Sequence, residues 1–421
     1  MSSNQWPLVQ TAGSTVVPNT PRTDVWPRLS DRAFETRPFH VMAILARAHA
    51  VRARGIQTVS MVVGEPDFPT PAPIVQAAQQ ALSSGQQHYT DAIGTQALRL
   101  AIAQDYADRD GLLIDPGRVA VTAGASAALL LTMGAILNPG DEVLIADPGY
   151  PCNRQFIAAM GGIPKPIVVS PQNHFAPTAD QVAAAWGPKT KALLLASPAN
   201  PTGCLLPLEQ AMAIDQVVRA RGGWFIADEI YLRLCFEGQP KSLLQFGEHI
   251  ISINSFSKTY SMTGWRLGWM VAPAPLVEAV ERLAQNLFIS PASLPQQAAL
   301  AAFTPQTQAI VETYRQAYAE HASYVLPRLE QMGLSVPARP DGAFYAYCDV
   351  SAVTDDSYAL CLQACDDLGV LLAPGRDFSD HQAERYLRVS FPKPVPVLSE
   401  GLDRLSRYFL GRKARQMDSS V

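Results

Sequence analysis

The stretch NSFSKTYSMTGWRLGWM, Asn254–Met270, carries the pattern on which the interpretation of the whole chain depends. It sets Lys258 among small hydroxylated residues and places Arg266 eight positions later, between two tryptophans. An apolar run, Ile250–Asn254, leads into it, and a second run, Leu267–Val271, overlaps its end. A surface loop has no need of such a pattern. A site that binds a phosphorylated carbonyl compound would use the amine, the hydroxyls and the guanidinium together.

The length and composition of the chain describe a globular protein of about two domains. It has 421 residues, of which 48% are hydrophobic and 17% charged, with a net charge of −4. This weak acidity gives no electrostatic reason to expect a nucleic acid or a membrane surface as partner. The sequence contains no run of 18 apolar residues, so no membrane span is expected. The first 25 residues do not resemble a secretory signal. A reduced cytoplasmic setting is the default expectation.

The cysteines and histidines show no spacing that is typical of a metal site. Cys361 and Cys365 lie four positions apart on an expected helix, but no second pair accompanies them. The seven histidines form no HxxH or HxxxH pattern. We therefore interpret the six cysteines as buried apolar thiols and predict no metal.

From about residue 60, short apolar runs alternate with helical ones. Continuous apolar runs of this length indicate strands that are buried on both faces, and so a mostly parallel sheet. The expected strands are Arg118–Thr122, Glu142–Ala146, Pro164–Val169, Ala192–Ala196, Trp224–Ala227, Ile250–Asn254 and Leu267–Val271. The expected helices between them are Ala125–Leu137, Thr178–Trp186, Leu208–Arg221 and Leu276–Leu287. The alternation predicts an α/β fold with a central sheet flanked by helices.

After about residue 300 the pattern changes to that of a smaller α+β domain. Its expected elements are a helix over Pro305–Met332, strands over Ser335–Pro337, Ala343–Asp349, Val370–Leu372 and Tyr386–Ser390, and a last helix over Leu398–Gly411. The helical stretch Pro38–Arg54 is expected to pack with them. The predicted organisation is an N-terminal arm (1–37), a small domain (38–60 and 301–413), a large domain (61–300) and a C-terminal tail (414–421).

Polar and aromatic residues follow five of the predicted strands. They are Ser126, Tyr150, Asn200, Asp228 with Tyr231, and Ser255 with Lys258. Ligands of open α/β sheets bind outside the carboxyl ends of the strands, where these residues would meet. Each residue alone could be an ordinary turn or cap residue, but together they indicate one site.

These residues suit a phosphorylated aldehyde that carries a ring nitrogen. TAGASAALLL, Thr122–Leu131, opens a helix with small residues, so its free amides and Ser126 would favour an anion. Ser255 and Arg266 could add phosphate donors. No GxxxxGK[ST] or GxGxxG motif is present, so neither a nucleoside triphosphate nor a dinucleotide is indicated, and a lysine beside phosphate donors can instead form a Schiff base with an aldehyde. Asp228 would pair with a protonated ring nitrogen.

The chain resembles the class I/II aminotransferases, which have fold type I and depend on pyridoxal 5′-phosphate (PLP). The resemblance spans about Pro38 to Phe409 and rests on motifs that follow one another in the family's order. They are VVGEPDFPTP, HYTDAIGTQALR, VTAGASAAL, DPGYP, SPANPTG, ADEIYLRL, SFSKTYSMTGWRLGW, PDGAFYAY and YLRVSFP.

The resemblance implies a role for each matching position. Lys258 would hold PLP as an internal aldimine and then move a proton in a ping-pong transfer from an L-amino acid to a 2-oxo acid. Asp228 would face the ring nitrogen, Asn200 and Tyr231 the ring oxygen, and Tyr150 the ring face. Four residues would hold the phosphate, namely Ala125, Ser126, Ser255 and Arg266.

The resemblance also implies substrate and partner contacts. Arg388 would bind the substrate α-carboxylate, with Gly64 and Asn200 nearby. Tyr89 would reach the phosphate in a neighbouring subunit, which implies a homodimer with shared active sites. No dependable match exists for a second arginine that would recognise a distal carboxylate, so the amino donor stays open.

Two alternatives share the same cofactor residues. One is another fold type I PLP enzyme, such as a carbon–sulfur β-lyase, a decarboxylase or a cyclopropane-forming synthase. The other is a non-catalytic PLP-binding regulator, although no segment the size of a helix-turn-helix domain precedes Pro38.

Overall fold

The computed structural model describes residues 29–418, and the chain divides into two units, Met1–Arg37 and Pro38–Val421. In the first unit, the described residues form one short helix, α1 (Asp31–Glu35). Residues 1–28 of the predicted N-terminal arm lie outside the described residues. The second unit contains every other element discussed below.

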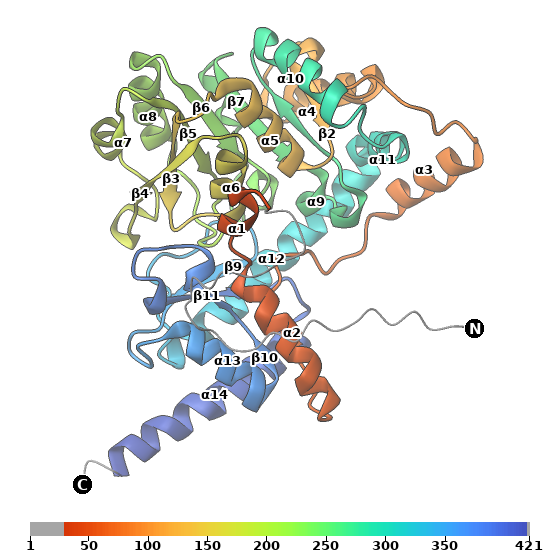
Figure 1. The fold of residues 1–421 in the computed structure, drawn as a ribbon. Coiled ribbons are helices and arrows are strands. Elements are labelled where there is room, and N and C mark those ends of the chain that lie inside the picture. The colour runs from red at the N-terminus through yellow and green to blue at the C-terminus, as the bar shows by residue number, and fades with distance from the viewer. Residues whose placement is uncertain (1–28, 419–421) are drawn as a thin grey trace. The chain divides into compact units, whose positions relative to one another are not determined.

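A seven-stranded sheet, in the order β2-β8-β7-β6-β5-β3-β4, lies among helices in the upper part of the second unit as drawn in Figure 1. Only β8 runs antiparallel to its neighbours, β2 and β7, so the prediction of a mostly parallel sheet is confirmed. The strands are β2 (Val119–Thr122), β3 (Glu142–Asp147), β4 (Ile163–Val168), β5 (Thr190–Ala196), β6 (Trp224–Asp228), β7 (Ile250–Ser255) and β8 (Gly268–Val271).

Successive strand residues enter two different hydrophobic cores. In β5, Leu193 belongs to one core and Leu194 to the other, and in β6 the same is true of Phe225 and Ile226. Side chains alternate between the faces of a strand, so the sheet has a core on each face, which explains why its strands are continuously apolar. The flanking helices are α3 (Ala72–Ser83), α4 (Gln96–Asp110), α5 (Ala125–Ile136), α6 (Pro151–Ala159), α7 (Ala179–Ala185), α8 (Leu208–Ala220), α9 (Phe256–Thr259), α10 (Ala274–Leu287) and α11 (Ser293–Ala299).

Two smaller sheets combine strands from the C-terminal part of the chain with β1, which precedes the large sheet. One is antiparallel, in the order β11-β12-β9, and the other pairs β1 with β10 in parallel. Their strands are β1 (Val59–Ser60), β9 (Tyr345–Asp349), β10 (Val370–Leu371), β11 (Ala373–Pro374) and β12 (Tyr386–Ser390). The predicted strand Ser335–Pro337 is wrong, because the structure has only a single bridge there, between Ser335 and Asp349. Pro337 has no amide hydrogen with which to continue the ladder.

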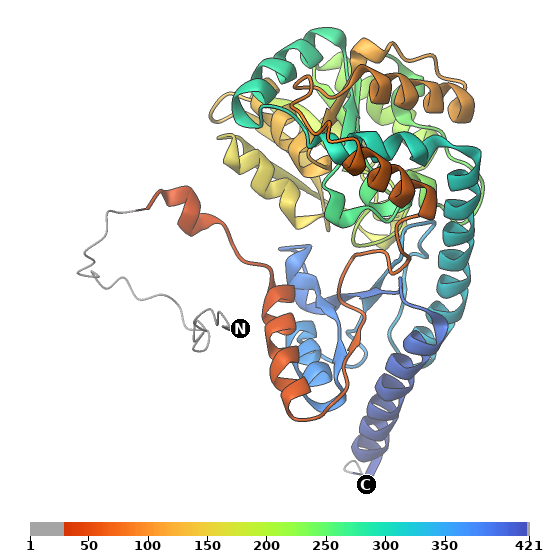
Figure 2. The same cartoon turned by 90° about the vertical axis from the view of Figure 1, so that its right-hand side faces the viewer.

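Helices α2 (His40–Ala53), α12 (Pro305–Gln331), α13 (Ser357–Leu368) and α14 (Val395–Asp418) accompany these sheets. As predicted for Pro38–Arg54, α2 packs against α13, β10 and β11. Figure 2 shows the long helix α12 running from the side of the large sheet to the smaller ones, where it packs against α14. Because α14 continues to Asp418, most of the segment predicted as a C-terminal tail extends this helix.

Two further sequence-based expectations concern cysteines and membranes. All six cysteines are free thiols, and all are buried except Cys152, which is half-buried. Within residues 29–418, no helix combines the length and the apolar character that crossing a membrane would need.

Candidate active site

One cavity of about 340 Å³ gathers every predicted site residue except Tyr89. These residues are Gly64, Ala125, Ser126, Tyr150, Asn200, Asp228, Tyr231, Ser255, Lys258, Arg266 and Arg388. The cavity lies beyond the carboxyl ends of β5, β6 and β7, which place Asn200, Asp228 and Lys258 at one edge of the sheet. The sequence pattern predicted this edge as the ligand site.

Lys258 reaches the cavity from α9, the single helical turn that follows β7. The turn begins where the Ser255 hydroxyl oxygen accepts a hydrogen bond from the Ser257 amide at 3.1 Å. The Lys258 ammonium donates to the Gly64 carbonyl at 2.7 Å. Burial lowers the pKa of Lys258 to about 8, so a useful fraction of the amine is uncharged near neutral pH. An uncharged amine is the form that attacks an aldehyde.

An anion-binding corner forms where α5 begins. The first amides of a helix, here those of Ala125 and Ser126, have no partner within the helix. Gly124 precedes them with φ 83°, and a Cβ atom there would lie 2.5 Å from Arg266 Nη2. Only glycine therefore allows the guanidinium to lie against this loop. Arg266 Nη1 donates to the Thr263 carbonyl at 3.0 Å, which orients the side chain.

Asp228 lies at the end of β6 and is 3% exposed. Its Oδ1 accepts a hydrogen bond from the Ile230 amide at 3.3 Å. Burial raises the pKa of this carboxyl to about 7, and the nearby Lys258 charge opposes the rise. A cation in the cavity, such as a protonated ring nitrogen, would keep the carboxylate ionised.

Tyr345 joins two parts of the cavity and was not predicted as a site residue. Its hydroxyl lies 2.6 Å from that of Tyr231, and the Arg388 guanidinium lies 4.5 Å from the centre of its ring. A Cβ atom at Gly64 would lie 2.3 Å from the Tyr345 hydroxyl, so glycine is needed there. Burial raises the pKa of both tyrosines, which keeps them protonated. The motif PDGAFYAY marked the segment, but the contact with Tyr231 depends on the fold.

Arg388 is 6% exposed and lies between two aromatic rings at the other end of the cavity. Its guanidinium carbon is 4.5 Å from the ring centre of Tyr345 and 4.7 Å from that of Phe378. Nη1 donates to Asn200 Oδ1 at 2.8 Å and Nη2 to the Val62 carbonyl at 2.6 Å. Nε is buried without a partner. The side chain is thus fixed in position and still has donor capacity for an anion.

Part of the cavity wall comes from segments that the sequence analysis did not assign to the site, and it includes apolar side chains and Asp377. Phe39 and Val41, at the start of α2, line it together with Phe378. Asp377 holds this start of α2 in place, because its carboxylate accepts hydrogen bonds from the His40 amide at 2.7 Å and the Val41 amide at 2.9 Å. Nothing in the local sequence indicated that these segments meet.

Tyr89 lies outside the cavity of its own chain. It is 85% exposed, on the loop between α3 and α4. The contact of Tyr89 with the phosphate in a neighbouring subunit therefore stays a prediction.

The cavity fits PLP on three independent observations. The corner at Gly124 offers amide, hydroxyl and guanidinium donors to a phosphate. Lys258 offers an amine whose pKa lies near neutrality. Asp228 offers a buried carboxylate in the same cavity, and a carboxylate can pair with a protonated ring nitrogen.

The chain is similar in sequence and in structure to known aminotransferases. The sequence profile of the aminotransferase class I and II family matches residues 56–405. A valine–pyruvate aminotransferase of Mycobacterium tuberculosis is 40% identical over 374 residues, which are 88% of this chain and 96% of that protein. An aspartate/prephenate aminotransferase of Thermus thermophilus is 33% identical, over 91% of this chain and 99% of that protein. A crystal structure of an aminotransferase from Mycobacterium tuberculosis superposes with a TM-score of 0.88 at 39% identity, covering 92% of this chain and all of that one.

The chain belongs to the class I and II aminotransferases. It is a PLP-dependent enzyme that transfers the amino group of an amino acid to a 2-oxo acid. This confirms the predicted family, fold, activity and cofactor. The names of the two relatives specify different amino acids, so membership in the family leaves the donor open.

Proposed function

We propose that the cavity binds PLP in one orientation. The amides of Ala125 and Ser126, with Ser255 and Arg266, hold the phosphate. Bound PLP supplies a reactive aldehyde and an electron-withdrawing ring. Asp228 faces the ring nitrogen. The remaining ring contacts come from Asn200 and Tyr231 at the ring oxygen and from Tyr150 at the ring face.

Other residues of this chain bind the substrate, move its proton or position the groups that do so. Arg388 binds the α-carboxylate. The Asn200 Oδ1 atom already accepts a hydrogen bond from Arg388, so the side-chain NH2 group of Asn200 is the part that donates to an acceptor in the cavity. Gly64 lies near the substrate, and its carbonyl orients the Lys258 amine by accepting a hydrogen bond from it. Lys258 Nζ takes a proton from the Cα of the amino donor in the first half-reaction and gives a proton to the Cα of the new amino acid in the second. Tyr345 positions both Tyr231 and Arg388 through its hydroxyl and its ring.

We also propose that the preferred amino donor carries an uncharged, mainly apolar side chain. Among the described residues that line the cavity, the cations are Lys258, Arg266 and Arg388, and each already has a task. A second carboxylate would meet the wall of Phe39, Val41 and Phe378 without a partner, at a cost in desolvation. The similarity to the valine–pyruvate aminotransferase supports the same donor class.

The experiment that tests transamination uses the PLP-loaded enzyme with valine and pyruvate. We expect sustained release of the 2-oxo acid that is formed from valine only when pyruvate is present. Without pyruvate, each active site should convert one valine and then stop. A carbon–sulfur lyase or a decarboxylase needs no acceptor. Sustained turnover of an amino acid without any oxo acid would therefore contradict the proposal.

We propose that the enzyme is a homodimer whose subunits share their active sites. The exposed Tyr89 lies near an exposed apolar segment formed by Leu287, Phe288 and Ile289. Hydrogen bonds from the Thr90 amide to Ser290 Oγ (3.4 Å) and from Gln296 to Thr90 Oγ1 (3.0 Å) hold the Tyr89 loop beside that segment. Grouped exposed apolar side chains favour an interface, and a twofold axis would present Tyr89 to the partner's phosphate corner.

Mixed dimers test this arrangement. Lys258→Ala and Tyr89→Ala subunits, each poorly active alone, are combined under conditions where dimers exchange. One site of a mixed dimer then has both residues intact, so random equal mixing should restore about one quarter of wild-type activity. If exchange is confirmed and the activity stays at the average of the two variants, Tyr89 does not act across an interface.

We further propose that residues 38–413 comprise a large domain over 61–300 and a small domain over 38–60 and 301–413. Every strand of the seven-stranded sheet lies between Val119 and Val271, while the smaller sheets use strands from the two outer segments. Limited proteolysis that cuts first near residues 60 and 300 would support these boundaries, and first cuts within either domain would contradict them.

We infer a reduced, cytoplasmic setting for the enzyme. All six cysteines are free, and none pairs with another in a disulfide. Localisation of the native protein by cell fractionation tests this inference, which recovery from an oxidising compartment would contradict.

A further inference from the structure

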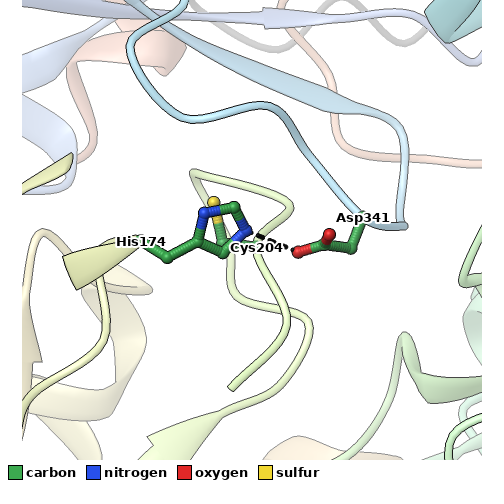
Figure 3. A group of neighbouring side chains, drawn as sticks. All are labelled: His174, Cys204 and Asp341. Atoms are coloured by element: carbon green, nitrogen blue, oxygen red, sulfur yellow. Dashed lines mark hydrogen bonds and ion pairs between the residues drawn. The ribbon is translucent and has the colours of Figure 1, made fainter. Parts of the chain in front are cut away.

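Outside the active-site cavity, the structure brings together three side chains that come from distant parts of the sequence. His174 follows a short turn at Pro171–Asn173, Cys204 follows the loop that carries Asn200, and Asp341 precedes β9 (Figure 3). One donor atom from each residue lies within 4.8 Å of those from the other two. None of the three lines the active-site cavity.

We propose that His174, Cys204 and Asp341 form a binding site for a Zn²⁺-type metal ion. An imidazole nitrogen, a thiolate and a carboxylate are ligands that zinc uses, and three protein ligands leave a fourth position for water. A thiolate and an imidazole favour zinc over magnesium or calcium. The sequence analysis predicted no metal because these residues share no local spacing.

The two outer ligands have room to adjust. His174 Nε2 lies 2.7 Å from Asp341 Oδ2, which is the length of a hydrogen bond. Two ligands at about 2.0–2.1 Å from a tetrahedral zinc are roughly 3.3 Å apart, so the ion would replace the shared proton and widen this gap slightly. The side chains of His174 and Asp341 are 36% and 42% exposed, which permits such a movement.

Cys204 supplies the inner ligand. It is 3% exposed, and its sulfur contacts the carbonyls of Thr202 and Arg339 at 3.8 Å, a distance that gives only weak hydrogen bonds. Burial raises the pKa of this thiol to about 12. Binding would release the thiol proton to solvent while the sulfur, nitrogen and oxygen take three positions on the ion.

The backbone around the cluster is already held in place. Asp341 Oδ2 accepts a hydrogen bond from the Leu205 amide at 2.7 Å, and the Asp341 and Gly342 amides donate to the Gly203 carbonyl at 2.9 and 3.1 Å. Such outer contacts orient metal ligands. An ion here would clamp the loop of Asn200 to the turn that leads into Tyr345, both of which line the active site.

A zinc titration of the chelator-treated holoenzyme, in competition with a chromophoric chelator, tests the site. We expect one tight Zn²⁺ per chain and at least about a tenfold weaker affinity in each of Cys204→Ser, His174→Gln and Asp341→Asn. Cys152→Ser, which changes the half-buried thiol, is the matched control and should bind like the wild type. Saturating zinc should raise the thermal unfolding midpoint by roughly 2–8 °C in the wild type and the control alone.

Cobalt supplies a second readout that a purely structural hydrogen bond would not give. Added Co²⁺ should produce a thiolate-to-metal absorption band, measured as a difference spectrum against the cobalt-free holoenzyme, and Cys204→Ser should lack it. Should Cys204→Ser fail to fold, the His174 and Asp341 variants give the same comparison for zinc. Wild-type enzyme that binds no zinc, or that binds it as well without these ligands, would overturn the proposal.

Discussion

The two ends of the active-site cavity are built in different ways. At the cofactor end, residues at the start of α5 and the carboxyl ends of β6 and β7 supply the phosphate corner, Asp228 and Lys258. The substrate end is built from three separate segments. The start of α2 supplies Phe39 and Val41, the turn after β11 supplies Phe378, and β12 supplies Arg388. The first end is fixed by a single sheet edge, whereas the second depends on the packing of separate segments. Under the proposed function, the catalytic groups lie at the edge of one sheet, and the wall that selects the amino donor comes from other segments.

The largest effect should follow from removing the amine at the cofactor end. Lys258→Ala should lower kcat by at least about 10⁴-fold, because both the covalent anchor and the proton carrier are lost. Circular dichroism should show an intact fold, and PLP should still bind through its phosphate. Substantial steady-state transamination by this variant would show that another residue carries out these tasks.

A smaller but still severe loss should follow from neutralising Asp228. Asp228→Asn should reduce kcat by roughly 100- to 1,000-fold, because a charge-stabilising partner of the ring nitrogen is removed. Asp228→Glu keeps the charge and should be milder, which makes it the matched control. Equal rates for the wild type and the asparagine variant would mean that Asp228 has only a structural role at the end of β6.

The next effect belongs to the substrate end. Arg388→Lys should lower kcat/KM by roughly 10- to 100-fold, because an ammonium cannot form two parallel hydrogen bonds with a carboxylate. Burst measurements with the amino acid alone should place the loss in substrate binding, and PLP affinity should stay unchanged. An unchanged kcat/KM would mean that the α-carboxylate binds elsewhere.

The smallest effect should come from the residue that joins the two ends. Tyr345→Phe removes the hydroxyl that lies 2.6 Å from Tyr231 but keeps the ring against Arg388. We expect about a fivefold loss in kcat/KM, the value of one hydrogen bond. We also expect a shift in the pH midpoint of the visible absorption of the holoenzyme, because Tyr231 loses its partner. A rate loss without that shift would leave Tyr345 with a packing role only.

The sequence predicted that Asp228, Lys258 and their neighbours would lie together, because these residues follow strands whose apolar runs are easy to recognise. Lys258 and Asp228 both lie within a few residues of a predicted strand end, and the parallel sheet brings such ends together. Tyr345 and Phe378 lie in loops and short elements whose contacts depend on packing. The strand expected to begin at Ala343 begins at Tyr345 instead, since Ala343 has φ 60°, a left-handed conformation that a strand excludes.

The most direct test of the account compares valine with aspartate in the first half-reaction of the PLP-loaded enzyme. Loss of the visible absorption of the cofactor is followed in single-turnover experiments at the same pH and ionic strength. The account predicts that valine reacts at least about 100-fold more efficiently, because aspartate would bury a second carboxylate against Phe39, Val41 and Phe378 without a cation. An aspartate reaction as efficient as that of valine, or more so, would contradict the account and require a further cation at the substrate end.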